Sequence, residues 1–180
     1  MKTKWLIFSL LFLSAALPSA EITESDFLRV SSGAADETWN TSTPKSTWDV
    51  VNQRGERVYL RGVNAGGWLI HEPWMTALTG EANDQYTMMT ELGKRFGTEK
   101  RDELIAVYED HYWTEADFDS CAAMGMNVIR LPFSWMNLVY FGDEPGKSRD
   151  LPELRPDAFK RLDWFIENCA KRGIYVILDM

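Results

Sequence analysis

Residues 114–132, TEADFDSCAAMGMNVIRLP, combine a helix and a strand in one short segment. Thr114 followed three residues later by Asp117 is a capping pattern, which predicts that a helix begins there. Gly125 suits the end of that helix. The run NVIRLP then reads as a short, mostly apolar strand bounded by Pro132. The segment therefore predicts one helix–strand unit of an α/β protein.

A second helix–strand unit follows, displaced by 48 residues from the first one. Five small or apolar positions recur in it: Cys121, Ala122, Gly125, Val128 and Ile129 correspond to Cys169, Ala170, Gly173, Val176 and Ile177. Two such units, with strands as apolar as IYVIL, are typical of a parallel sheet covered by helices. Equivalent positions on neighbouring helices lie about 8–10 Å apart, whereas a disulfide needs Cα atoms within about 7 Å. We therefore expect both cysteines to be small buried side chains rather than a disulfide.

The preceding part of the chain is less regular. Residues 48–60, WDVVNQRGERVYL, predict two short strands around a glycine-containing turn, and the second strand runs on to Asn64. A long connection follows, with helical character over residues 86–96 and a helix from Thr98 to about Tyr112. The apolar stripe of that helix is expected to be Leu104, Val107, Tyr108 and Tyr112.

The first 47 residues are expected to lie outside the α/β unit. Residues 1–20 resemble a signal peptide, because Lys2 and Lys4 precede an apolar run of 13 residues, Trp5 to Leu17. That run is shorter than the roughly 20 residues of a membrane-spanning helix. Residues 21–47 are rich in Ser, Thr, Gly and acids, which predicts a flexible arm or linker. We expect a secreted, extracellular or cell-wall-associated protein with no membrane anchor.

Composition narrows the classes of function. The 180 residues are 45% hydrophobic and 26% charged, as in ordinary globular domains, and they can bury a sizeable core. A net charge of −8 disfavours nucleic acid or an anionic membrane as partner, because both are polyanions. The two histidines lack a metal-ligand spacing, and neither a phosphate-binding glycine loop nor a G-x-S-x-G turn is present. These residues indicate no metal site.

Three polar residues fall at the carboxyl ends of predicted strands. Asn64 follows the first strand, Arg130 lies late in the second, and Asp179 lies late in the third. Ligands of parallel sheets and barrels bind at that edge, so these residues form the candidate site. The competing interpretations are a structural ion pair for Arg130, a turn conformation for Asn64 and a structural role for Asp179.

Residues 61–75, RGVNAGGWLIHEPWM, place Glu72 among tryptophans. A surface loop with one solvated acid and a sugar pocket are the two interpretations. Trp68 and Trp135 follow predicted strands, where an aromatic ring could stack on a sugar face, and Trp74 is a further candidate. Trp164, inside a predicted helix, is expected to lie in the core instead.

Three stretches resemble a known family: RGVNAGGWLIHEPWMT, YWTEADFDSCAAMGMNVIRLPFSW and GIYVILDM. Together they are similar to glycoside hydrolase family 5, in particular to its exo-1,3-beta-glucanase (glucan 1,3-beta-glucosidase) group. The resemblance covers about residues 48–180. It implies the N-terminal part of a (β/α)8 TIM barrel, with the first three strands and the helices between them. It also implies a retaining mechanism that uses two glutamates about 5 Å apart and requires no metal and no organic cofactor.

The resemblance further implies individual roles. Glu72 matches a carboxylate that hydrogen-bonds hydroxyls of the terminal glucose. Arg130 matches the arginine that lies beside the nucleophile and keeps it ionised. Asp179 matches the acid that begins a D-x-H-G stretch. His71 stands where the family commonly has an apolar residue, so a difference in pocket polarity is expected there.

The family's acid/base glutamate follows the fourth strand and its nucleophile the seventh, so neither is expected in this chain. A complete barrel needs about 250 residues, and three strands leave an unpaired apolar edge. We therefore expect the front part of a longer, monomeric enzyme that acts on a polysaccharide or oligosaccharide. The 180 residues alone are expected neither to fold stably nor to hydrolyse a glycan. The alternatives are an enzyme of the same fold acting endo on cellulose, xyloglucan or mannan, and a non-catalytic glycan-binding protein.

Overall fold

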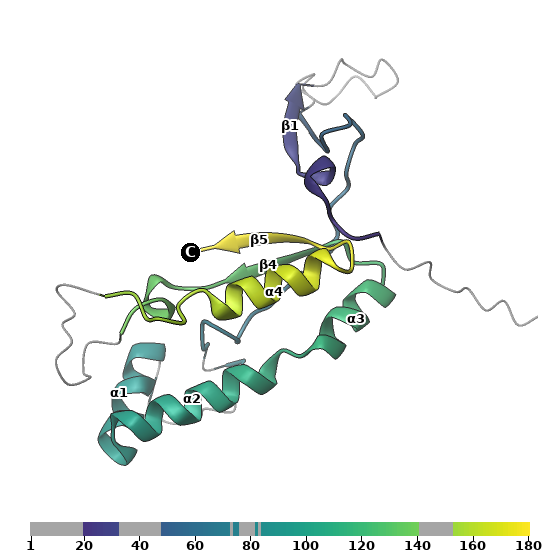
Figure 1. Ribbon diagram of the computed structural model, residues 1–180. Coiled ribbons are helices and arrows are strands. Elements are labelled where there is room, and N and C mark those ends of the chain that lie inside the picture. The colour runs from purple at the N-terminus through teal and green to yellow at the C-terminus, as the bar shows by residue number, and fades with distance from the viewer. Residues whose placement is uncertain (1–19, 33–47, 73, 76–81, 83, 141–152) are drawn as a thin grey trace, which may run out of the picture.

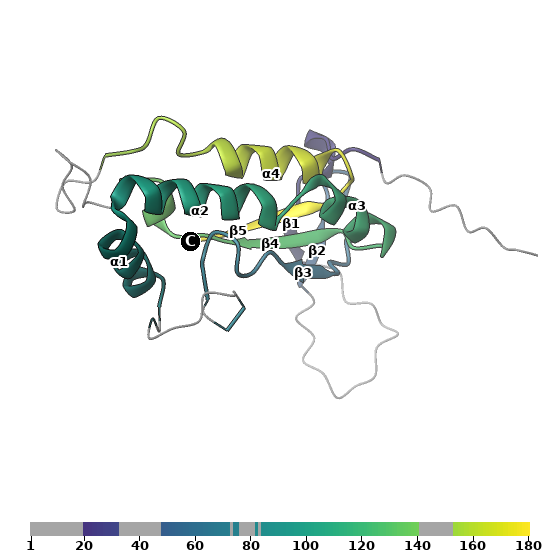
Figure 2. The ribbon, with the colours of Figure 1, turned by 90° about the horizontal axis from the view of Figure 1, so that it is seen from below.

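The computed structural model describes residues 20–32, 48–72, 74–75, 82, 84–140 and 153–180. Within these ranges a parallel sheet carries helices α2, α3 and α4 on one face, and its other face is open (Figures 1 and 2). Nearly all of the expected signal peptide lies outside the described residues.

The sheet has three strands in the order β3 (Gly62–Asn64), β4 (Val128–Pro132) and β5 (Tyr175–Asp179). All neighbours are parallel, with Ile129 opposite both Val63 and Val176. The α/β class and the parallel sheet are therefore confirmed.

Both helix–strand units that the sequence pattern predicts are present. Helix α3 (Glu115–Ala123) begins after Thr114, whose backbone N and hydroxyl donate to the Asp117 carboxylate at 2.7 and 2.8 Å. The sequence favours a helix start near Pro156 in the second unit, whereas helix α4 (Lys160–Ala170) starts four residues later. Gly125 and Gly173 follow the two helices with φ of 69° and 67°, a left-handed conformation that glycine adopts without a steric penalty.

Helices α1 (Gln85–Phe96) and α2 (Thr98–Tyr112) form the long connection between β3 and α3. The expected buried stripe of α2 is wrong in part, because Leu104 is 39% and Val107 is 53% exposed. The tyrosines of the stripe are half-buried instead, and Arg101 on the same helix is fully buried. Helix α2 turns its tyrosines inward because their hydroxyls bond main-chain carbonyls of the loop that follows β3.

The hydrophobic core lies between the sheet and its helices. Ile129 and Leu131 of β4 are fully buried there, against Phe118 of α3 and Phe165 of α4. Cys121 and Cys169 belong to the same core and are both free thiols, as expected. Since alternate residues of a strand face opposite sides, Arg130 faces away from the helices.

A small antiparallel hairpin lies beyond the amino ends of the parallel strands (Figure 1). Its strands are β1 (Arg29–Ser32) and β2 (Trp48–Val51), preceded by a 3₁₀ turn, η1 (Glu24–Asp26). The sequence pattern predicts a flexible arm where β1 lies, and it predicts that residues 48–51 pair with residues 57–60. In the structure β2 pairs with β1 instead, and the expected pairing is reduced to a bridge between Val51 and Arg57. Strand β1 is exposed and serine-containing, so it lacks the apolar alternation that marks a strand; residues 33–47 lie outside the described ranges.

Candidate functional site

The open face of the sheet carries three of the expected site residues at its carboxyl edge. Arg130 donates a hydrogen bond from Nη2 to the Asp179 carboxylate of the neighbouring strand. Asn64 is the register partner of Arg130 on β3, so its side chain belongs to the same face. The Ala65 amide continues this pairing by donating to the Arg130 carbonyl at 2.8 Å. The structure thus brings Asn64, Arg130 and Asp179 together.

The Arg130–Asp179 pair contributes little to stability. The two side chains are 42% and 46% exposed, and ion pairs with this much exposure contribute about 0–1 kcal/mol. Such a small gain does not explain why a strand would carry an arginine. A guanidinium on an open face can instead hold an anionic group in place through charge-assisted hydrogen bonds.

The loop after β3 is seated on helix α2 through its glycine pair. The Tyr112 hydroxyl donates to the Gly66 carbonyl at 3.0 Å, and the Tyr108 hydroxyl donates to the Gly67 carbonyl at 2.5 Å. Gly67 has φ of 76°, and a Cβ there would lie 2.7 Å from the Tyr112 hydroxyl oxygen. The glycines therefore allow the loop backbone to approach the tyrosines closely.

Trp68 is part of the core and does not line an open surface. Its side chain is 1% exposed, and its Nε1 donates to the Glu109 carbonyl at 2.7 Å. Its ring lies 5.4 Å from that of Phe165 and 6.1 Å from that of Trp164. The sugar-stacking surface expected of Trp68 is therefore not available, because the ring is enclosed by protein.

Glu72 and Trp135 lie on two loops that are tied together. Glu72 is half-buried in the loop after β3, and Trp135 is 49% exposed in the 3₁₀ turn η2 (Trp135–Asn137) after β4. The Asn137 amide donates to the Leu69 carbonyl at 2.9 Å and joins the two loops. Trp135 retains an accessible ring, as does Trp74, which is 79% exposed.

A buried ionisable group lies directly beside Glu72. His71 is 2% exposed, and its ring packs at 4.8 Å from that of Tyr108. His71 Nε2 lies 4.0 Å from Glu109 Oε1, and Glu109 Oε2 lies 3.3 Å from Arg161 Nε. We expected His71 to change the polarity of a pocket surface, but its imidazole is buried and does not reach the surface. The contact could not be predicted from the sequence, since His71 and Glu109 are 38 positions apart and share no motif.

Burial shifts both groups of this contact toward their neutral forms. It lowers the pKa of His71 to about 4, against the weaker opposing effect of a hydrogen bond to the Trp68 backbone. It raises the pKa of Glu109 to about 7, although Arg161 favours the ionised form. Neither ring nitrogen of His71 has a hydrogen-bond partner of good geometry among the described residues.

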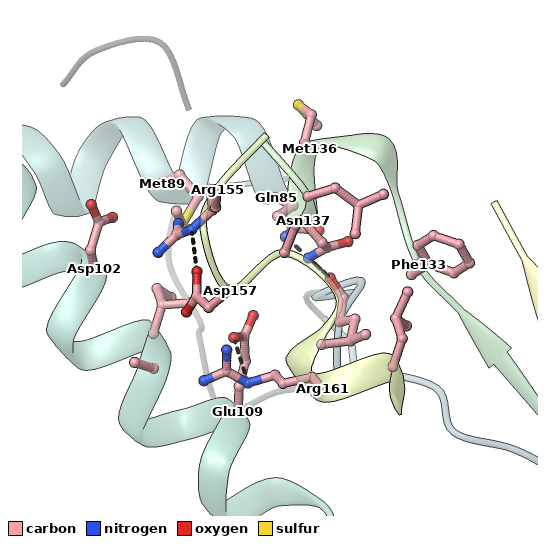
Figure 3. Close-up of a pocket in the computed structure, with 16 residues that line it drawn as sticks. Gln85, Met89, Asp102, Glu109, Phe133, Met136, Asn137, Arg155, Asp157 and Arg161 are labelled. Carbon is pink, nitrogen blue, oxygen red and sulfur yellow. Dashed lines mark hydrogen bonds and ion pairs between the residues drawn. The ribbon is translucent and has the colours of Figure 1, made fainter. Parts of the chain in front are cut away.

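A cavity of about 100 Å³ opens next to Glu109 on the helix side of the sheet (Figure 3). Arg155 and Arg161 line it and pair with Asp157 and Glu109, at 3.6 and 3.3 Å. Phe133 and Leu162 provide apolar wall. The Arg130–Asp179 pair does not line this cavity, so it is separate from the open face of the sheet.

Two further properties hold for the part of the chain that the structure describes. No group of three or more His, Cys, Asp and Glu side chains there is arranged to hold a metal ion. No helix there is both long and apolar enough to cross a membrane.

Parallel β/α units whose polar residues gather at the carboxyl ends of the strands define part of a (β/α)8 barrel of the enzyme type. Residues 84–180 match the family model described as cellulase (glycosyl hydrolase family 5). The chain belongs to this family, which confirms the resemblance found in its sequence.

Individual relatives agree with this assignment. The chain is 33% identical to a beta-xylosidase of Phanerodontia chrysosporium, over 73% of this chain and 25% of the relative. It is 33% identical to a glucan 1,3-beta-glucosidase of Blumeria graminis, over 74% and 29%. The crystal structure of AoRut superimposes with a TM-score of 0.51 at 25% identity, over 67% of this chain and 32% of that chain. The chain therefore spans about a quarter to a third of the length of these relatives.

Proposed function

We propose that the protein is a secreted glycoside hydrolase that cleaves beta-glucan, acting from chain ends on β-1,3-glucosidic bonds. Family membership and the relative named glucan 1,3-beta-glucosidase support this proposal. The observation that carries it is the gathering of Asn64, Arg130 and Asp179 at the carboxyl edge of the sheet, next to the loop of Glu72. The substrate is a polysaccharide or oligosaccharide.

In the proposed mechanism two glutamates downstream of residue 180 carry out the bond cleavage. One protonates the leaving oxygen and the other attacks the anomeric carbon, which gives a covalent intermediate that water hydrolyses with retention. The Arg130 guanidinium keeps the attacking carboxylate ionised through charge-assisted hydrogen bonds. The Glu72 carboxylate accepts hydrogen bonds from hydroxyls of the terminal sugar, and the exposed ring of Trp135 provides a surface for a sugar face.

Product analysis on the native protein tests this proposal. The protein is incubated with a linear β-1,3-glucan, and the first sugar released is followed by proton NMR before mutarotation. Exo-action with retention yields β-glucose as the first product. A first product that is α-glucose, or a mixture of longer oligosaccharides, would contradict the mechanism or the exo-action respectively.

A second candidate is a β-xylosidase, because a relative of that name is 33% identical to this chain. Xylose differs from glucose by the loss of the C6 hydroxymethyl group, so the two substrates test one end of the sugar pocket. We expect kcat/KM for an aryl β-glucoside to exceed that for the matching xyloside at least about tenfold, a difference of about 1.4 kcal/mol. The reverse order favours the second candidate, and binding to insoluble glucan without any turnover favours a non-catalytic role.

A further inference from the structure

The loop that carries Glu72 is held from behind by helices α1 and α2. Besides the two tyrosine hydroxyls that bond the glycine carbonyls, Gln85 Oε1 accepts from the His71 backbone N at 3.1 Å. These contacts fix the main chain as far as His71. Glu72 follows directly, so the position of its backbone depends on how His71 is seated.

The His71 imidazole is an unusual choice for a site as deeply buried as this one. Packing against Tyr108 needs only an apolar ring or chain of similar size. A buried polar group without a partner destabilises the fold, so a leucine would be the simpler solution. His71 has only a weak hydrogen bond to the Trp68 backbone, so its polar atoms require a reason other than packing.

Glu109 provides that reason. Its Oε1 faces His71 Nε2 at 4.0 Å, and its Oε2 faces Arg161 Nε at 3.3 Å. Arg161 is itself held by Asp110, which accepts from its Nη2 at 2.7 Å. A shift of about 1 Å brings His71 and Glu109 to hydrogen-bond distance. The three side chains thus link the Glu72 loop to α2 and α4, behind the substrate face.

We propose that His71, Glu109 and Arg161 form a positioning triad that fixes the direction of Glu72 and thereby the affinity for the terminal sugar. This inference rests on the proposed function in so far as Glu72 binds the sugar. None of the three residues contacts substrate or the reacting atoms. The triad acts through the backbone that joins His71 to Glu72.

Kinetics on the native protein with β-1,3-glucan separate positioning from packing. We expect His71→Leu to raise KM about tenfold while kcat changes less than about twofold, because a ground-state binding contact is misplaced and the chemistry is not. His71→Gln keeps a polar group close to the position of Nε2 and is expected to restore most of the affinity. Glu109→Leu should act like His71→Leu, and the double variant should be no worse than either single one.

The matched control is His111→Gln. His111 is exposed on the same helix as Glu109, and its Nδ1 contacts the Val107 carbonyl at 2.8 Å. This control is expected to leave KM unchanged. If His71→Leu raises KM no more than His111→Gln does, or if His71→Gln behaves like His71→Leu, the proposal is overturned.

A second measurement does not depend on hydrolysis. Hydrogen exchange followed by mass spectrometry is expected to show faster exchange in residues 65–72 of His71→Leu and Glu109→Leu than in wild type. Cys169→Ala, a core truncation on α4, controls for general loss of stability and should change exchange in this loop less than His71→Leu does.

The two measurements distinguish the possible failures. If exchange and KM both stay at wild-type values, the triad is refuted while the proposed function stands. If the wild-type protein hydrolyses no glycan but exchange in the loop rises, the proposed function fails and the seating of the loop by the triad is supported.

Discussion

Arg130 illustrates how a single residue can matter for activity while contributing little to the fold. Its ion pair with Asp179 is half exposed, so its loss costs the fold about 0–1 kcal/mol. Its proposed hydrogen bonds to a catalytic carboxylate are charge-assisted and planar, and an ammonium group cannot reproduce them.

We therefore expect Arg130→Lys to lower kcat/KM about 10- to 100-fold, the equivalent of one lost charge-assisted hydrogen bond. The melting temperature should change little. Arg54→Lys is the matched control, since Arg54 forms ion pairs with Asp26 and Glu56 in the N-terminal region. Steady-state kinetics and thermal unfolding of both variants check this, and an equal loss of activity in the two would contradict a specific role for Arg130.

Glu72 gives a second prediction at this scale. Glu72→Gln keeps the shape of the side chain but removes its charge, and sugar hydroxyls donate more weakly to an amide oxygen. KM for β-1,3-glucan is expected to rise about tenfold with little change in kcat. Glu56→Gln in the N-terminal region is the control; a fall of kcat without a rise of KM in Glu72→Gln would instead place Glu72 in the chemistry.

The sequence predicts which residues lie at the strand ends better than it predicts which side chains are buried. Asn64, Arg130 and Asp179 were predicted to meet because the carboxyl ends of parallel strands share one edge, and they do meet. The sequence does not distinguish Trp68 from Trp135, because both residues follow a strand. The difference is that the loop after β3 folds back onto α2 and carries its tryptophan into the core.

At the level of elements, the joint between the β3 loop and α2 depends on Gly67. A Cβ at this position meets the Tyr112 hydroxyl at 2.7 Å, and the backbone is left-handed as well. We expect Gly67→Ala to reduce the free energy of unfolding by about 2–3 kcal/mol, through strain and clash together. Urea denaturation of the native protein measures this.

Gly55 offers a control that separates the two causes. It has φ of 82°, but nothing lies within 4 Å of the place that a Cβ would occupy, so Gly55→Ala suffers the strain without the clash. Gly55→Ala should therefore lose less stability than Gly67→Ala. Adding Tyr112→Phe to Gly67→Ala should recover part of the difference, and strict additivity in that pair would argue against the clash.

The sequence repeat predicts a helix and a strand in each unit, but it does not predict how the two strands are aligned in the sheet. Ile129 and Ile177 are equivalent in the sequence repeat, yet Ile129 is fully buried and Ile177 is 45% exposed. The sheet pairs Ile129 with Val176 instead, one residue earlier. A slip of one residue reverses the face of a strand, and a stagger of this kind belongs to barrels, where alternate strands fill each layer. Sequence periodicity alone does not contain this stagger.

For the molecule as a whole, His71 and Glu109 make opposing contributions to stability as pH changes. Glu109 has a folded pKa of about 7 against an ordinary value of 4.5, so its contribution is present below pH 4.5 and is lost as pH rises through 7. His71 has a folded pKa of about 4 against 6.5, so its contribution is present above pH 6.5 and is lost as pH falls through 4. Between pH 4.5 and 6.5 the two contributions change in opposite directions, so the free energy of unfolding is nearly independent of pH there.

A variant that lacks one of the two groups should show the pH dependence of stability that the other group causes. His71→Gln leaves Glu109 and should lose stability as pH rises from 4.5 to 7, whereas Glu109→Gln leaves His71 and should lose stability as pH falls from 6.5 to 4. Each change is expected to be on the order of 2 kcal/mol. The charged neighbours of Glu109 are the same in both variants: Arg155, Asp157, Arg161 and Asp110. Urea denaturation between pH 4 and 7 measures the free energy of unfolding of both variants. If it changes with pH in the same direction in the two variants, the opposing contributions of His71 and Glu109 are ruled out.

The two free thiols of the core allow local unfolding of the protein to be measured by chemical modification. Burial raises the pKa of the Cys169 thiol to about 12 and also raises that of Cys121, so neither is a thiolate at neutral pH. Water-soluble alkylating reagents attack the thiolate, and they reach these sulfurs only when α3 or α4 lifts from the sheet. The alkylation rate at each sulfur therefore reports how often its own helix detaches, without any added dye or engineered label.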